Sequence, residues 1–260
     1  MKRSHDEIRK AVRSRYGKLA SSKSTGCGCG SGSCCDSGSS EKTPAHGVGY
    51  TKSELKQVPI LSHMPLGSGH PVAISNLKPG DTILDLGSGA GLDCFLAREK
   101  VGDSGNVIGV DMTPEMITLA RKSAEESGYE NIDFRLGEIE NLPVADTSID
   151  VIISNCVINL SPDKSRVFEE SYRVLKKGGR LCLSDILAIN EIPDEVRENM
   201  NLYSSCIGGA ALISEMEQML KDAGFSKVQI KVQEHDGISK CSPENEMGRY
   251  VVSAMIEAEK

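Results

Sequence analysis

The residues with the clearest chemistry lie in a glycine-rich turn after an apolar stretch. Residues 83–91 read I-L-D-L-G-S-G-A-G, which gives the spacing D-x-G-x-G-x-G beginning at Asp85. Glycines in such a turn let the backbone approach a ligand closely. The dinucleotide fingerprint G-x-G-x-x-G would require glycine at position 92, where this chain has Leu92. The turn therefore indicates a nucleoside cofactor and favours S-adenosylmethionine over NAD.

Three polar residues that follow later apolar stretches extend this site. Asp111 ends the second stretch, where a carboxylate can accept hydrogen bonds from both ribose hydroxyls of a nucleoside. Glu138 ends the third, where an acidic side chain can meet an adenine amino group, and Asn155 ends the fourth. Taken alone, Asp111 could instead cap the helix that starts near Pro114, and Glu138 could be a solvated turn residue. Their common position after strands favours a binding role.

Nine cysteines form the second group of candidates. In a reducing compartment they are interpreted as thiols, ligands or redox groups before structural disulfides. Cys156 follows the fourth apolar stretch and Cys206 lies in the segment after the fifth, so two thiols from different loops could face a methyl donor. This pair favours a soft, thiophilic substrate, although each could be a small core residue. Seven cysteines remain. We expect Cys94 and Cys182 in the core and assign no role to Cys241. The other four are close together in the sequence: Cys27, Cys29, Cys34 and Cys35.

Apolar stretches and helical patterns alternate through the centre of the chain and predict its fold. This βαβ alternation, rich in Ile, Val and Leu, favours a parallel sheet that is covered by helices on both faces. Two alternating strands close the chain and predict an antiparallel pair. The seven predicted strands are 82–86, 106–110, 132–136, 150–154, 180–186, 227–234 and 249–258, and the helices are 90–100, 114–127, 163–175 and 213–223, with a helix-prone stretch at 190–202.

Composition shifts divide the chain into three parts. Residues 1–46 combine an amphipathic helix with a Ser/Gly/Cys-rich flexible segment, whose cysteine cluster could also bind a metal ion of its own. Residues 47–188 are the expected cofactor-binding core, and residues 189–260 are the expected lid and final two strands. The net charge of −7 disfavours nucleic acid as a partner, and no apolar run approaches the roughly 20 residues of a membrane span. We expect a cytoplasmic monomer without a secretory signal.

Beyond these patterns, residues 72–186 resemble the class I S-adenosylmethionine-dependent methyltransferases, which have a Rossmann-like fold. The motifs N-C-V-I-N-L at 155–160 and C-I-G-G-A at 206–210 resemble the arsenite methyltransferase family, and the resemblance covers nearly the whole chain. It implies an N-terminal helical arm, a substrate lid and trivalent arsenic bound by cysteine thiolates. The cofactor residues that it implies are Asp85, Gly87, Ser88, Gly89, Asp111, Met112, Gly137, Glu138, Ile139 and Asn155.

One position departs from the family pattern. The family commonly carries Cys in the turn that contains Ser68, and a hydroxyl cannot replace a soft ligand. The resemblance assigns arsenic(III) to Cys156 and Cys206. The third thiol must come from elsewhere, with Cys34 and Cys35 as candidates, or the site uses only two thiols.

The resulting hypothesis is an arsenite methyltransferase for arsenic detoxification. Its substrate would be arsenite or a thiol conjugate of it, with glutathione or thioredoxin as the thiol reductant. One alternative is a class I methyltransferase that acts on carbon or oxygen of a small organic acceptor such as a quinone or sterol. The other is a non-catalytic thiol protein that senses metalloids and retains the cofactor fold.

Overall fold

The computed structural model describes residues 3–21, 49–64, 66–233 and 249–260. The predicted roles of Cys27, Cys29, Cys34, Cys35 and Cys241 therefore lie outside the described residues. The strands are β1 (Thr82–Leu86), β2 (Asn106–Asp111), β3 (Ile132–Leu136), β4 (Ile149–Asn155), β5 (Leu175–Ala188), β6 (Ser226–Val232) and β7 (Val251–Glu259).

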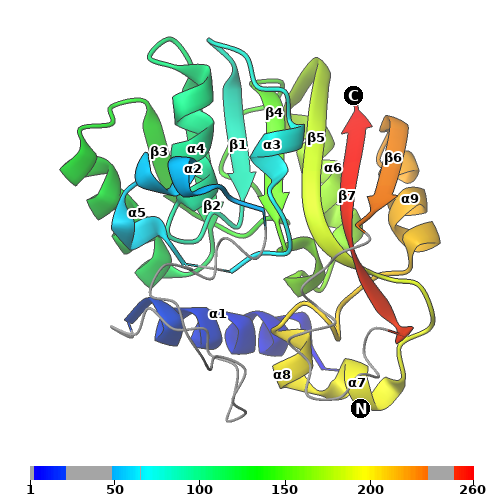
Figure 1. Ribbon diagram of the computed structural model, residues 1–260. Coiled ribbons are helices and arrows are strands. Elements are labelled where there is room, and N and C mark those ends of the chain that lie inside the picture. Colours follow the sequence, from blue (N-terminus) through cyan, green and yellow to red (C-terminus); the bar gives the residue numbers. More distant parts are fainter. Residues whose placement is uncertain (1–2, 22–48, 65, 234–248) are drawn as a thin grey trace.

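The seven strands found in the described residues form one sheet in the order β3-β2-β1-β4-β5-β7-β6. The first five run parallel, β7 is antiparallel to both of its neighbours, and β6 therefore points in the direction of β5. The predicted fold class is confirmed, including the antiparallel terminal pair. Strand β7 inserts between β5 and β6, so the chain order and the spatial order differ at this edge (Figure 1).

Helices cover both faces of the sheet, as a parallel sheet requires. One core cluster joins the sheet to α6 and α9, and a second joins its other face to α3, α4 and α5. Outside α1, the helices are α2 (Lys52–Lys56), α3 (Pro71–Ile74), α4 (Leu92–Val101), α5 (Pro114–Ser127), α6 (Lys164–Val174), α7 (Asp194–Glu198), α8 (Met200–Tyr203) and α9 (Ile213–Asp222), with 3-10 turns η2 (Ile60–Ser62) and η3 (Ile158–Leu160).

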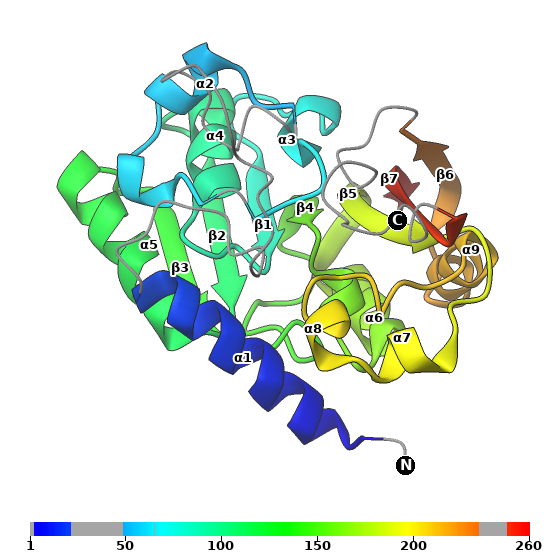
Figure 2. The same ribbon diagram turned by 60° about the horizontal axis from the view of Figure 1, so that its bottom comes forward.

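The carboxyl ends of the parallel strands are covered by the N-terminal helix and by the segment after β5. Helix α1 (His5–Ser21) crosses this end of the sheet between α5 and α8 (Figures 1 and 2). The helix-prone stretch 190–202 forms two short helices, because the Asn199 side chain accepts hydrogen bonds from the backbone N–H groups of Asn201 and Leu202 and starts α8 anew. Among the described helices, none is long and apolar enough to cross a membrane.

Candidate active site

A pocket lies at the carboxyl ends of β1, β2 and β4 beneath α1. The space between its lining residues, including the opening to solvent, is about 1060 Å³. Nine of the ten predicted cofactor residues line it; the exception is Glu138. The lining residues that carry the following argument are Arg9, Tyr16, Tyr50, Asp85, Gly87, Ser88, Gly89, Asp93, Asp111, Met112, Gly137, Ile139, Glu140, Asn155 and Cys156.

The glycine-rich turn forms one wall of the pocket and packs against the loop after β4. Gly87 has a φ of +68°, and a Cβ atom there would lie 2.4 Å from Cγ2 of Val157. Gly89 has a φ of +52°, and a Cβ there would meet nothing within 4 Å. At Gly87 the absence of a side chain therefore permits close packing, whereas at Gly89 it leaves the backbone open to a ligand.

Asp111 ends β2 and is fixed by backbone donors. One carboxylate oxygen accepts a hydrogen bond from the N–H of Gly89 at 3.0 Å, and the other accepts one from the N–H of Thr113 at 2.8 Å. Burial raises the pKa of Asp111. The carboxylate therefore ties the glycine turn to the start of α5, and its remaining lone pairs can accept ribose hydroxyls.

The two acidic residues after β3 point in different directions. Glu138 is partly exposed and pairs with Arg9 and Arg13 of α1, each at 3.3 Å, away from the pocket lining. Glu140 is buried and lines the pocket, where its carboxylate accepts hydrogen bonds from the hydroxyl of Ser161 at 2.7 Å and from Arg9 at 3.4 Å. The structure thus places Glu140 at the pocket, and Glu138 at the contact with α1.

Helix α1 contributes directly to the pocket, which the sequence pattern did not indicate. Arg9, Val12 and Tyr16 all line it. Tyr16 is deeply buried, its hydroxyl donates a 3.4 Å hydrogen bond to the carbonyl of Ser204, and burial raises its pKa well above the usual value. Since the ion pairs of Arg9 hold α1 against the turn after β3, the helix closes one side of the pocket.

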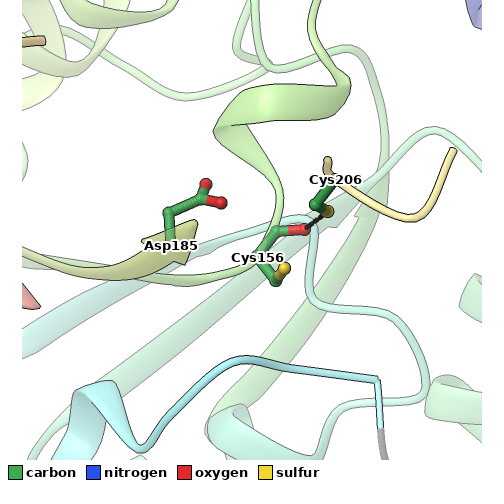
Figure 3. Close-up of side chains that lie close together, drawn as sticks. All are labelled: Cys156, Asp185 and Cys206. Atoms are coloured by element: carbon green, nitrogen blue, oxygen red, sulfur yellow. Dashed lines mark hydrogen bonds between the residues drawn. The ribbon is translucent and has the colours of Figure 1, made fainter. Parts of the chain in front are cut away.

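The two predicted thiols meet at the edge of this pocket. The sulfur atoms of Cys156 and Cys206 and a carboxylate oxygen of Asp185 all lie within 4.8 Å of one another. The Cys206 thiol donates a 2.9 Å hydrogen bond to the carbonyl oxygen of Cys156, as Figure 3 shows. Cys156 also lines the pocket described above. The structure therefore places two thiols that are 50 positions apart in the sequence close together.

Both thiols are held in a backbone conformation that residues with side chains rarely adopt. Cys156 has a φ of +58° and Cys206 a φ of +67°. Such left-handed residues cost of order 1 kcal/mol and cluster at functional sites. The hydrogen bond with Cys156 and burial raise the pKa of Cys206 well above its usual value, so this sulfur is a neutral thiol when no substrate is bound.

Asp185 of β5 holds the loop that carries Cys156. Its carboxylate accepts hydrogen bonds from the N–H groups of Ile158 and Ile186, at 2.9 and 2.7 Å, and from the Asn159 amide at 2.9 Å. Burial raises the pKa of Asp185 to about 6. Sequence reasoning missed this residue, since an Asp within a buried apolar strand is identified only by what packs beside it.

Ser68 occupies a hydrogen-bonded turn beside the pocket. Its N–H donates to the side-chain oxygen of Asn155 at 2.9 Å, and its hydroxyl lies 3.1 Å from that of Ser184. The Asn155 amide also donates to the carbonyl of Gly69 at 2.7 Å. Asn155 therefore anchors the 67–69 turn next to Cys156. Among the other described cysteines, Cys182 and Cys94 are buried in the core as predicted.

These features define a class I methyltransferase: a seven-stranded sheet with a reversed strand, a glycine turn after the first strand and an acid after the second. A methyltransferase-domain family model matches residues 77–224. An arsenite methyltransferase from Halobacterium salinarum is 45% identical over an alignment that covers 99% of this chain and 68% of that relative. One from Aquipseudomonas alcaligenes is 41% identical over 84% of this chain and 62% of its own length.

A solved structure supports the same family assignment. The crystal structure of an arsenic(III) S-adenosylmethionine methyltransferase from Chlamydomonas reinhardtii has 29% identity and a TM-score of 0.60, and the match covers 83% of this chain and 72% of that one. The chain belongs to the arsenite methyltransferase family and is an S-adenosylmethionine-dependent methyltransferase. The predicted family membership and enzyme class are thereby confirmed.

Proposed function

We propose that the protein transfers a methyl group from S-adenosylmethionine to trivalent arsenic that is bound by the thiolates of Cys156 and Cys206. The observation that supports this most directly is the meeting of two thiols from separate loops, within 4.8 Å, at the edge of the cofactor pocket. Trivalent arsenic prefers soft sulfur ligands. An organic acceptor such as a quinone gives no reason for this pair.

The residues present fit the methyl donor. Asp111 offers acceptors for ribose hydroxyls, the backbone at Gly89 is open, and Ile139 and Met112 supply an apolar surface in the lining. When bound, S-adenosylmethionine supplies an electrophilic methyl group. The protein needs no general base for the transfer, because arsenic bound to sulfur retains a lone pair that can attack in line. Its main task is to align the two centres.

Substrate capture exchanges oxygen ligands for sulfur. Each thiol that replaces a hydroxide of arsenite forms an As–S bond, and the thiol proton leaves with that hydroxide as water. The Cys206 thiol must give up its hydrogen bond to the Cys156 carbonyl in this step. Attack by the arsenic lone pair forms the As–C bond, breaks the bond between the methyl carbon and the donor sulfur, and formally oxidises arsenic(III) to arsenic(V). A small thiol such as glutathione, or a thioredoxin, is the proposed reductant that returns arsenic to the trivalent state, and a cytoplasmic monomer with reduced thiols is the proposed working state.

The test is transfer of labelled methyl from S-adenosylmethionine to arsenite with glutathione present, between pH 6 and 9. Cys156→Ser and Cys206→Ser should each abolish transfer and leave cofactor affinity nearly unchanged, whereas Cys182→Ser, at a buried core thiol, controls for general loss of a sulfur. Absence of methylated arsenic across this pH range would refute the proposal. Loss of cofactor binding in the two site variants would show that these residues act elsewhere.

The third sulfur is tested separately. We propose Cys34 or Cys35 as its source, and a two-thiol site as the alternative. Cys34→Ser and Cys35→Ser, singly and together, are compared with Ser68→Cys for arsenite affinity. Retained affinity in the double variant would favour the two-thiol site. A gain in Ser68→Cys would show that the 67–69 turn reaches the bound arsenic.

A further inference from the structure

Helix α1 is fastened to α8, the short helix that precedes Cys206. The Arg15 guanidinium donates hydrogen bonds to the hydroxyl of Ser204 at 3.2 Å and to the carbonyl of Asn201 at 3.5 Å. The hydroxyl of the adjacent Tyr16 donates to the carbonyl of Ser204 at 3.4 Å. The two helices lie side by side, as Figure 2 shows. Hydrogen bonds from two consecutive residues of α1 therefore converge on α8 and its last turn.

An apolar contact between the two helices accompanies these hydrogen bonds. Val12, one helical turn before Tyr16, is 1% exposed and belongs to a buried cluster that also contains Tyr203 of α8 and Cys206 itself. Tyr16 packs against the same cluster. The polar contacts of α1 thus lie beside a shared apolar core, which holds α1 and α8 together as one unit.

The position of the Cys206 sulfur follows that of α8. The N–H of Cys206 donates to the carbonyl of Tyr203 at 3.0 Å. The N–H groups of Ile207 and Gly208 both donate to the carbonyl of Leu202 at 3.0 Å. Cys206 has the left-handed backbone with which helices commonly end. Since all three hydrogen bonds return to α8, a shift of this helix displaces the sulfur.

Hydrogen bonds also join this region to the loop after β4. The Tyr203 hydroxyl donates to the carbonyl of Ser161 at 3.4 Å, and the Cys206 thiol donates to the carbonyl of Cys156 at 2.9 Å. The thiol bond is given up when the sulfur binds arsenic, and the substrate then replaces it on the Cys156 side. The contacts from α1 do not involve the sulfur, so they hold α8 both before and after the substrate binds.

We infer that Arg15 is a positioning residue for the arsenic site, because by fixing α8 it sets the position from which Cys206 reaches toward Cys156. This inference rests on the proposed function, in which both cysteines bind arsenic. The second As–S bond forms at the effective concentration that the structure imposes on the second sulfur, so a displaced Cys206 weakens the chelate. The residues that line the cofactor pocket include Tyr16 but not Arg15. Loss of Arg15 should therefore weaken arsenic binding and spare the cofactor.

The test uses phenylarsine oxide, a trivalent arsenical that binds pairs of thiols and needs no methyl donor. Each of two thiols forms an As–S bond, and the two thiol protons leave with the oxide oxygen as water, so arsenic stays trivalent. Calorimetry measures its affinity for the whole chain, and the binding that is lost in Cys206→Ser defines the thiol pair. We expect Arg15→Met, which keeps an unbranched apolar stem and removes the donors, to weaken this binding about tenfold. Affinity for S-adenosylmethionine should stay nearly unchanged.

Lys18→Met is the matched control, because it removes an exposed cation from the same helix. It should leave the affinity for phenylarsine oxide unchanged. Ser204→Ala removes the hydroxyl that accepts from Arg15 at 3.2 Å, so it should weaken binding by a smaller factor in wild type and have little further effect in Arg15→Met. Should Arg15→Met fail to fold, Ser204→Ala alone carries the expectation.

Three results would overturn the inference. The first is unchanged affinity for phenylarsine oxide in Arg15→Met, and the second is an equal loss of cofactor affinity, which would indicate a general loosening of α1. The third is binding that Cys206→Ser does not reduce, because Cys206 would then belong to no pair of thiols. The proposed function is judged separately by methyl transfer, since a protein that binds phenylarsine oxide through Cys206 but yields no methylated arsenic refutes that proposal alone.

Discussion

The contact between Gly87 and Val157 joins the cofactor turn to the thiol loop, and Gly87→Ala tests its energetic weight. The new Cβ would lie 2.4 and 2.5 Å from the two methyl groups of Val157, at a φ of +68°. The left-handed backbone costs about 1 kcal/mol, and overpacking adds about 1–3 kcal/mol. We therefore expect a total loss of about 2–4 kcal/mol in the free energy of unfolding.

Urea unfolding measures this loss, and a second substitution isolates its cause. Val157→Ala removes both methyl groups that meet the new Cβ, although the contact with the Val157 Cβ at 3.0 Å remains. In the Gly87→Ala background it should recover about 1 kcal/mol, whereas in wild type it should cost about 1 kcal/mol. Gly89→Ala, where a Cβ meets nothing within 4 Å, should show the backbone cost alone.

The double-mutant cycle can refute this explanation of the stability loss. If Val157→Ala costs the same in both backgrounds, the contact does not carry the effect and the turn is not packed against the thiol loop as described. If it rescues stability, methyl transfer should recover with it, because Val157 directly follows Cys156.

Three further predictions concern the elements around the pocket. Arg9→Gln removes the ion pairs that hold α1, including the one to buried Glu140, and should speed cofactor dissociation severalfold in stopped-flow measurements. Burial raises the pKa of Asp185 from 3.8 to about 6. The protonated carboxyl therefore contributes fully to stability below about pH 4, and this contribution is lost as the pH rises through 6. The melting temperature of the cofactor-free protein should accordingly fall between about pH 5 and 7, and a rise would contradict this. Gly209→Ala would place a Cβ 2.1 Å from the backbone oxygen of Asn159, and we expect loss of transfer with cofactor affinity, measured by calorimetry, nearly unchanged.

The central sheet could be predicted because its signals are local. Runs of Ile, Val and Leu mark strands that are buried on both faces, and the ends of parallel strands meet at one edge, so Asp85, Asp111 and Asn155 could be grouped without a structure. The prediction that Cys156 and Cys206 act together depended on the resemblance of their two motifs to a known family.

The parts that escaped prediction depend on contacts between distant segments. Nothing in the amphipathic pattern of α1 says which surface it covers, so the roles of Arg9 and Tyr16 could not be seen. Which of Glu138 and Glu140 lines the pocket depends on the turn after β3 and on Arg9, which pairs with both. Tyr50 comes from an irregular segment, and its bond to Asp93 spans 43 residues.

In the proposed arsenic site, the hydrogen bond between Cys206 and the Cys156 carbonyl makes the segment that carries Cys206 a reporter of occupancy. A thiolate has no proton to donate, so once arsenic takes the Cys206 sulfur, the attraction across 2.9 Å becomes a repulsion between two electron-rich atoms. The segment that carries Cys206 must then be held by the substrate itself. Hydrogen exchange in residues 200–210 should consequently change when arsenite binds, before any methyl group is transferred.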